Sequence, residues 1–234
     1  MNRKRFKPAV VVISGNKRHG KNTLADFIEQ NLEKEGIVEQ FAYADALRKV
    51  CSTLLMLPED SVWLKELKDA PLPRLFNLCT GRDVLKFVGG LFRKFDADYW
   101  AKQLVSRLKE SEADYAIITD CRFANELSGL IIPEVRCLVH IRIINPNAPE
   151  PQEGDVTEKL FHIADLDKDL PFTYSTYYEC ADGYVDTVHI WLGSVIHVEV
   201  VNNGTVDNLS SVASKLSSSI YEHFSRFYPV EAYQ

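Results

Sequence analysis

The chain has 234 residues, 46% of them hydrophobic and 26% charged, which is ordinary for a globular protein and enough to bury a full core. A formal net charge of -6 argues against a surface dedicated to DNA or RNA, and no stretch approaches the roughly 20 apolar residues of a membrane span. The five cysteines are scattered without a CxxC pair, which indicates reduced thiols rather than a disulfide framework or a zinc site.

The opening residues, "MNRKRFKPAVVVISG", place an apolar run behind a basic end, as a signal peptide does. The run is too short for the hydrophobic region of a signal peptide, and no cleavage site follows it. We therefore interpret 9–14 as a strand buried on both faces of a sheet, followed by an amphipathic helix at 20–35. We expect a cytoplasmic protein.

Strand and helix patterns alternate along the chain up to residue 145. The expected elements, in order, are a strand at 38–44, a helix at 45–56 with Asp45 near its N-cap, an irregular segment at 57–80, helices at 81–92 and 96–108, a strand at 115–120, a short helix at 123–130, a strand at 136–144 and a loop at 145–155. This alternation predicts an α/β fold, a largely parallel sheet flanked by helices.

Residues 170–200 change in character, because they are rich in Thr, Tyr, Val and His. We predict a β-hairpin insertion at about 165–195 that ends in a core strand at 195–201. A last helix is expected at about 206–225. Asn202 and Asn203 precede that helix, and a plain turn is favoured there over a contact with adenine.

The loop between the first strand and the first helix, "GNKRHGKN", has Gly15, Gly20 and Lys21 at the GxxxxGK spacing. This spacing binds phosphate because backbone amides and a helix N-terminus surround the oxygens while lysine supplies a positive charge. Chance could produce the pattern in an ordinary strand–helix turn, but its position after the first strand favours function. The predicted ATP contacts are Gly15, Asn16, Lys17, Arg18, His19, Gly20, Lys21, Asn22 and Thr23.

Asn22 stands where such loops carry a Ser or Thr that binds magnesium. Its amide oxygen can bind the metal, although more weakly than a carboxylate. Thr23 points in a different direction on a regular helix and does not simply replace it. Two alternatives stay open: the metal contacts Asn22 directly, or it is bound through water.

Beyond the loop, the chain resembles the deoxynucleoside monophosphate kinases of bacteriophages, which are P-loop proteins. The blocks "SGNKRHGKNTLADFI", "YADALRKVC", "GRDVLKF" leading to "DYWAKQL", and "ITDCRFANEL" carry the resemblance in the same order, over most of residues 8–145. Members of this family often have Asp after the loop lysine, so Asn22 departs from an Asp. The chain is also distantly similar to animal-type phosphomevalonate kinases, which share the loop and an Asp-x-Arg motif.

The resemblance implies a P-loop kinase-like fold and transfer of the γ-phosphoryl group of ATP, with Mg²⁺, to a (deoxy)nucleoside monophosphate. It implies ATP and the monophosphate as partners, no nucleic acid polymer, no membrane, and a homodimer. We expect a single kinase domain over 1–234, with its core at 8–56, 115–145 and 195–225, an acceptor-binding helical region at about 57–112, a lid at about 143–160 and the insertion at about 165–195.

Asp120 ends the strand "AIITD", so we expect it at the carboxyl edge of the sheet beside the phosphate loop. It is a candidate magnesium ligand, together with Asn22, and the alternative is a helix N-cap. By resemblance, Arg122 holds the acceptor phosphate or the transferring group, because a guanidinium binds two phosphate oxygens at once. A surface pair with Glu126, four residues on, is the other reading, and Glu126 could also orient Arg122.

Other candidates for the acceptor are Asp45, Arg74, Arg82 and Arg93, each of which has an ordinary structural alternative such as capping or a solvated charge. By resemblance, Arg142 follows the fourth strand and is a lid arginine that reaches the donor phosphates; an ordinary charge at a strand end is the alternative. We predict Lys21, Asp120, Arg122 and Arg142 as the catalytic set. Two rival functions stay open: a kinase for another small phosphate ester such as phosphomevalonate, and a catalytically silent nucleotide-binding protein.

Overall fold

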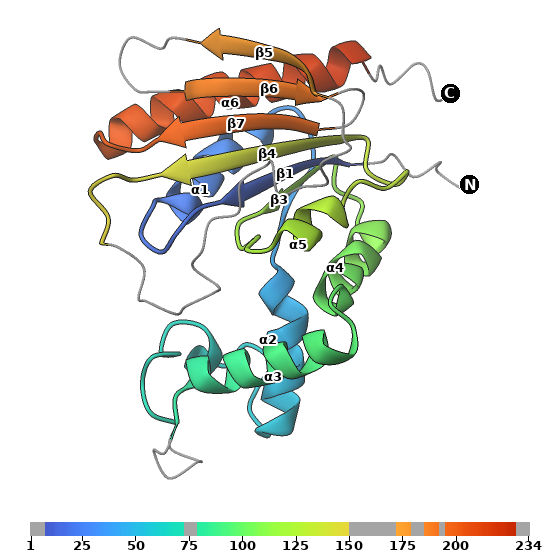
Figure 1. The fold of residues 1–234 in the computed structure, drawn as a ribbon, viewed down its shortest axis with the longest axis vertical. Coiled ribbons are helices and arrows are strands. Elements are labelled where there is room, and N and C mark those ends of the chain that lie inside the picture. The colour runs from blue at the N-terminus through green and yellow to red at the C-terminus, as the bar shows by residue number, and fades with distance from the viewer. Residues whose placement is uncertain (1–7, 73–78, 150–171, 179–184, 192–194, 228–234) are drawn as a thin grey trace.

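The computed structural model describes residues 8–72, 79–149, 172–178, 185–191 and 195–227, with the backbone alone at 172–178, 185–191, 195 and 226–227. Its centre is a seven-stranded sheet of order β2-β3-β1-β4-β7-β6-β5 (Figure 1). The strands are β1 (Ala9–Ser14), β2 (Val38–Phe41), β3 (Tyr115–Ile118), β4 (Cys137–Ile144), β5 (Phe172–Tyr178), β6 (Val185–Trp191) and β7 (Val195–Val201). The five strands from β2 to β7 in that order are parallel, β6 pairs antiparallel with β7, and β5 pairs antiparallel with β6. The predicted α/β fold is confirmed, and it is compatible with a P-loop kinase.

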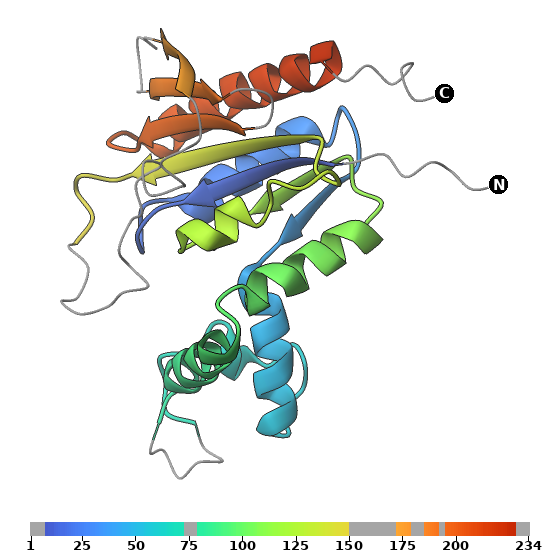
Figure 2. The ribbon, with the colours of Figure 1, turned by 45° about the vertical axis from the view of Figure 1, so that its right-hand side comes forward.

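Helices cover both faces of this sheet. The helices are α1 (Lys21–Leu32), α2 (Tyr43–Leu54), α3 (Gly81–Phe95), α4 (Tyr99–Glu110), α5 (Ala124–Ser128) and α6 (Val206–Phe227), with one 3-10 turn at Val62–Leu64. Helices α1 and α6 lie on one face and α4 and α5 on the other, while α2 and α3 extend beyond the sheet (Figures 1 and 2). None of the described helices has the length and apolar character needed to cross a membrane.

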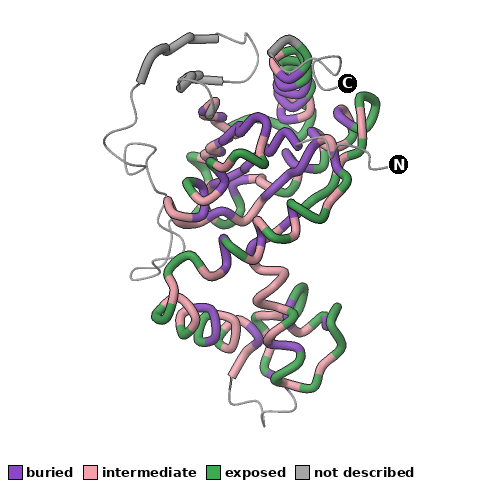
Figure 3. The backbone as a smooth tube through the Cα atoms, turned by 90° about the vertical axis from the view of Figure 1, so that its right-hand side faces the viewer, coloured by how far each residue is buried: buried purple, intermediate pink, exposed green. Residues whose placement is uncertain are grey.

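The central strand β1 is apolar on both sides because both sides are covered. Val11 and Ile13 belong to the core under α1 and α6, whereas Val10 and Val12 belong to the core under α4 and α5. This double burial explains the unbroken apolar run that the sequence shows. Figure 3 shows buried backbone concentrated in the sheet and its covering helices, with more exposed backbone in the α2–α3 region.

The α2–α3 region has a small core of its own. Cys51, Leu64 and Val88 are its buried residues, and partly buried apolar side chains of α2 and α3 pack around them. The first residue of α3 is Gly81, and a larger residue would not fit there because its Cβ would lie 2.1 Å from the carbonyl oxygen of Trp63. The helix therefore starts in close contact with the segment that precedes it.

Two details differ from the sequence prediction. Helix α2 begins at Tyr43, so Asp45 is its third residue rather than its N-cap, and its Oδ2 accepts a hydrogen bond from the amide of Ala42 at 3.2 Å. The predicted β-hairpin is present as β5 and β6, but it extends the main sheet because β6 pairs with β7. Much of the predicted lid at about 143–160 lies outside the described residues.

A row of polar side chains crosses the buried part of the sheet. Ser14 Oγ lies 2.7 Å from His140 Nε2, and His140 Nδ1 lies 2.9 Å from His197 Nδ1. His197 Nε2 is 3.9 Å from Glu199 Oε1, which accepts a hydrogen bond of 2.8 Å from Arg142. Ser14, His140 and His197 are each at most 2% exposed, so their polar atoms depend on one another for hydrogen bonds.

This row generates a prediction about pH. Burial, followed by the nearby His197 and Arg142, holds the pKa of His140 well below its ordinary value, so the imidazole is neutral in the folded chain. The unfolded chain binds the extra proton as the pH falls below about 6.5, so the free energy of unfolding should fall there. Urea denaturation between pH 7.5 and 5.5 measures this loss, which His140→Gln should reduce.

The control is Ser14→Ala, which removes a hydrogen bond but no titrating group. It should lower stability at every pH and retain the pH dependence of the natural protein. Equal pH slopes for His140→Gln and the natural protein would contradict the assignment.

Candidate functional site

The phosphate loop has a backbone that requires glycine at both ends. Gly15 has φ 154° and Gly20 has φ 97°, values that side-chain-bearing residues rarely adopt. A Cβ at Gly15 would lie 2.5 Å from the carbonyl oxygen of Ile143 in β4, and one at Gly20 would lie 2.6 Å from Nδ2 of Asn202. The loop therefore sits directly against the ends of its neighbouring strands.

Side chains hold the loop against those strands. His19 is buried and its Nδ1 lies 3.0 Å from the Ile143 carbonyl oxygen. Asn202, which follows β7, donates a hydrogen bond of 2.9 Å to the carbonyl oxygen of His19. Asn202 thus supports the loop, a role that its sequence neighbourhood did not reveal. His19 faces the protein rather than a ligand.

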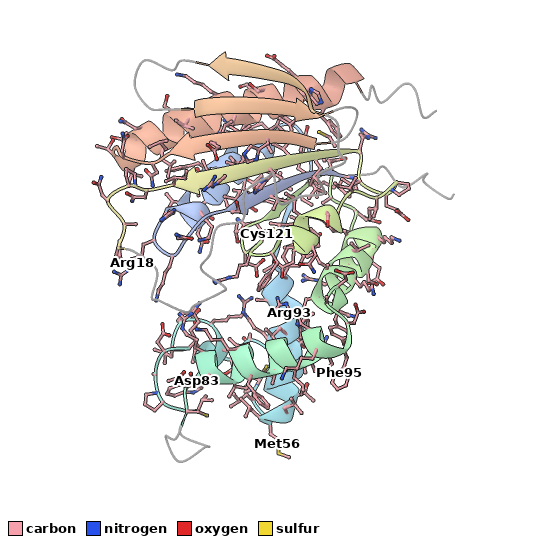
Figure 4. The ribbon with its side chains drawn as sticks, viewed as in Figure 1. Arg18, Met56, Asp83, Arg93, Phe95 and Cys121 are labelled. Atoms are coloured by element: carbon pink, nitrogen blue, oxygen red, sulfur yellow. The ribbon has the colours of Figure 1, made fainter. Side chains whose placement is uncertain are left out.

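Lys21 begins α1 and turns back over the loop. Its Nζ donates hydrogen bonds of 2.7 Å to the carbonyl oxygens of Gly15 and Asn16. The ammonium group is therefore already placed within the loop. Lys17, Arg18 and Asn22 are exposed, and Figure 4 shows Arg18 at the left-hand side of the molecule, beside the loop between β1 and α1.

Asp120 follows β3 at the same edge of the sheet and binds the start of α2. Its Oδ1 accepts the amide hydrogen of Tyr43 at 2.8 Å, and its Oδ2 accepts that of Ala44 at 2.9 Å. Loss of hydration raises the pKa of Asp120, and these amides oppose the rise. Asp120 therefore caps a helix, as the alternative interpretation held, although the helix is α2 rather than the one that follows it.

Glu126 organises the turn after Asp120. It is 3% exposed, and its Oε2 accepts the amide hydrogens of Arg122 at 2.8 Å and Phe123 at 3.2 Å. Its Oε1 binds Arg93 of α3 at 2.9 Å, and the Arg93 guanidinium also lies 4.5 Å from the centre of the Phe123 ring. Glu126 thus fixes the backbone of Arg122 and the side chain of Arg93.

Four basic residues, called here the cationic cluster, influence one another through their charges: Arg48, Lys68, Arg82 and Arg122. Burial lowers the pKa of Lys68, and the charges of Arg82, Arg48 and Arg122 lower it further. Arg82 makes a two-pronged salt bridge with Asp69 and holds the pKa of that carboxyl at about 2. Lys17 of the phosphate loop lies 3.9 Å from the same carboxylate, so the loop and the cluster meet at Asp69.

Other predicted residues lie elsewhere. Asp45 binds Arg48 and Arg107, each at 2.7 Å, and so joins α2 to α4. Arg142 lies inside β4 rather than after it, is 13% exposed, and binds Glu199 of β7 at 2.8 Å. That contact keeps Arg142 within the sheet. Arg74 lies outside the described residues.

No three side chains among His, Cys, Asp and Glu form a group suited to a metal ion within the described ranges. Asn22 is exposed at the start of α1, and both oxygens of Asp120 already accept amide hydrogens. This arrangement fits a metal that brings most of its ligands with it, as Mg²⁺ does when it is bound to phosphate and water.

Comparison with known proteins gives one informative similarity. No protein-family model matches the chain. The chain is 26% identical over 131 residues to a protein of Acanthamoeba polyphaga mimivirus described as a "Putative deoxynucleotide monophosphate kinase". The aligned segment covers 50% of this chain and 65% of the mimivirus protein, so the chain matches just under two thirds of its relative.

The geometry of Asp120 generates a second prediction. Asp120→Asn replaces one acceptor oxygen by an amide group that cannot accept from the α2 backbone, so we expect the free energy of unfolding to fall by about 1–3 kcal/mol. Urea denaturation with and without Mg²⁺ measures it. If Asp120 acts through capping, the loss is the same in both conditions; unchanged stability would contradict the capping role.

Proposed function

We propose that the protein transfers the γ-phosphoryl group of ATP to a (deoxy)nucleoside monophosphate, giving the diphosphate and ADP. The observation that carries this proposal is the meeting of the phosphate loop and the cationic cluster, where Lys17 and Arg82 share the carboxylate of Asp69. Anions bound by the loop and by the cluster would be neighbours, as phosphoryl transfer requires. The similarity to the mimivirus protein supports a nucleotide kinase.

The cluster is suited to the acceptor phosphate. Burial is the main cause of the lowered pKa of Lys68, and the positive charges of Arg82, Arg48 and Arg122 lower it further, so a positive potential acts on this lysine. Asp45 and Asp69 offset part of it through Arg48 and Arg82. A phosphate dianion would offset more, because it can accept several charge-assisted hydrogen bonds from guanidinium groups.

The chemistry needs positive charge and alignment more than a base. A phosphate monoester has its second pKa near 6, so at neutral pH it is largely a dianion and already a nucleophile. The remaining difficulty is to bring two polyanions together and to stabilise charge in the transition state. We assign Lys21 and the loop amides to the donor phosphates, and Arg122 with its cluster to the acceptor phosphate.

Magnesium is expected to accompany ATP, where it neutralises charge on the β- and γ-phosphates. Mg²⁺ usually keeps several waters and takes few protein ligands, so Asn22 is suited to bind it directly and Asp120 through water. The chain itself supplies the loop, the lysine and the arginines that orient the two nucleotides.

The test is a coupled ADP-release assay with ATP, Mg²⁺ and each of the common ribo- and deoxyribonucleoside monophosphates in turn. We expect turnover with at least one of them. Turnover with phosphomevalonate alone would transfer the proposal to that substrate class. ATP binding without turnover on any acceptor would show a silent nucleotide-binding protein, in which Asn22 marks the loss of metal-dependent catalysis.

Lys21→Ala should abolish turnover, because the ammonium group stabilises the negative charge on the transferring phosphate. The circular dichroism spectrum should stay that of the natural protein. The control is Lys34→Ala, which removes an exposed lysine just after α1. Activity of Lys21→Ala equal to that of the control would refute the role of the loop.

Lys68→Met and Arg122→Ala test the acceptor side. We expect Lys68→Met to raise the KM for the monophosphate about tenfold or more, since one charge-assisted hydrogen bond contributes roughly 1.5–3 kcal/mol, while the KM for ATP changes little. Arg122→Ala should lower kcat/KM by several orders of magnitude. Steady-state kinetics with each substrate varied separately gives both numbers, and equal effects on the two KM values would remove Lys68 from the acceptor site.

A further inference from the structure

Asp69 places one negative charge between the phosphate loop and the cationic cluster. Its Oδ1 accepts a hydrogen bond from Nε of Arg82 at the start of α3, and its Oδ2 accepts one from Nη2 of the same residue at 3.0 Å. The second oxygen also lies 3.9 Å from Nζ of Lys17 in the phosphate loop. Figure 4 shows Arg18 of the loop and Asp83 of α3 on the same side of the molecule, in agreement with this contact.

The way in which Asp69 binds Arg82 is also the way in which an arginine binds phosphate. In both cases two N–H groups of the guanidinium donate to two oxygens of the anion. A phosphate that approached Arg82 from the side of the phosphate loop would need the N–H groups that Asp69 now occupies. The carboxylate and such a phosphate therefore exclude each other.

Backbone contacts hold Arg82 in place without the help of this carboxylate. The amide of Arg82 donates a hydrogen bond of 2.7 Å to the carbonyl oxygen of Lys68. The neighbouring Gly81 lies so close to this segment that a Cβ there would be 3.3 Å from Cα of Lys68. The start of α3 and the segment that carries Asp69 are thus joined through their backbones.

The exposure of the side chains makes the contact easy to break. The side chains of Asp69 and Lys17 are each 59% exposed, so water can replace either partner at small cost. The side chain of Arg82 is 25% exposed and has less access to water. Arg82 holds the pKa of Asp69 at about 2, so the carboxylate carries its charge throughout the physiological pH range.

From these contacts we infer that Asp69 is an internal competitor for phosphate. It binds Arg82 and Lys17 while no phosphate is bound at the cationic cluster, and it turns into water when a phosphate takes its place. The inference rests on the proposed function in one respect, because it takes the cluster as the acceptor site. Its consequence is weaker binding of every phosphate at this site, which favours the release of product when Asp69 returns.

The test is calorimetric titration of the full chain with inorganic phosphate in the absence of ATP. Asp69→Asn retains the size of the side chain and removes its charge, so we expect the dissociation constant for phosphate to fall about two- to tenfold. A dissociation constant that stays the same or rises would overturn the inference, because Asp69 would then support Arg82 instead of competing with phosphate.

Two matched variants separate competition from a change in net charge. Asp69→Glu retains the carboxylate and should retain the weak phosphate binding of the natural protein. Glu66→Gln removes the same charge from an exposed side chain of the same segment, and it should also leave phosphate binding unchanged. A gain in affinity for Glu66→Gln as large as that for Asp69→Asn would contradict a specific role of Asp69.

Phosphate has a second place to bind, which is the phosphate loop. Lys21→Ala weakens binding there, so Asp69→Asn should still raise the affinity for phosphate when it is added to Lys21→Ala. If the gain disappears in this double variant, the phosphate lies in the loop and the inference fails.

The titration requires no turnover, so its result is separate from that of the ADP-release assay. Tighter phosphate binding by Asp69→Asn, with no turnover on any acceptor, would support the competitor and reject the kinase. Turnover together with unchanged phosphate binding would support the kinase and reject the competitor.

Discussion

The carboxylate of Asp120 connects the sheet to the helices that extend beyond it. The first amides of a helix have no acceptor within the helix and carry its positive dipole end, so a carboxylate placed there fixes the helix start. Asp120 binds the first two amides of α2, and α3 in turn packs on α2 through Val88. Arg48 lies on α2 and Arg82 lies on α3, so Asp120 at the end of β3 helps to fix the positions of both.

Contacts with residues that are distant in sequence also fix the phosphate loop. Its conformation is set by contacts with Ile143 and Asn202, which are far away in sequence, rather than by the loop residues alone. Lys21 satisfies two carbonyl groups of the loop, so the loop is shaped around an ammonium group before any phosphate arrives. Preorganisation of this kind reduces the entropy that must be lost when a ligand binds.

Periodicity and spacing predicted most of the fold, because β1 is apolar on both faces and α1 is apolar on one. The predicted start of α2 was wrong by two residues. The carboxylate that caps this helix belongs to Asp120, 77 residues along the chain from Tyr43, so the local sequence does not show it. In the site, the loop was recognisable from its glycines and lysine. The sequence analysis did not propose Arg48 and Lys68 as site residues, because a single charge on a helix or in an irregular segment is usually solvated and only the tertiary structure lets such charges influence one another.

The buried row of Ser14, His140 and His197 has a consequence for how the sheet assembles. Parallel strands made of valine and isoleucine offer little to distinguish one alignment from the next, since a shift exchanges one aliphatic contact for another. His140 stands beside His197 in the observed pairing. A slip by a single residue would turn one imidazole to the other face and strand both in hydrocarbon. A misaligned sheet is therefore less stable. The observed register pairs Ser14 with Arg142 of β4, and this places Gly15, the first residue of the phosphate loop, beside Ile143.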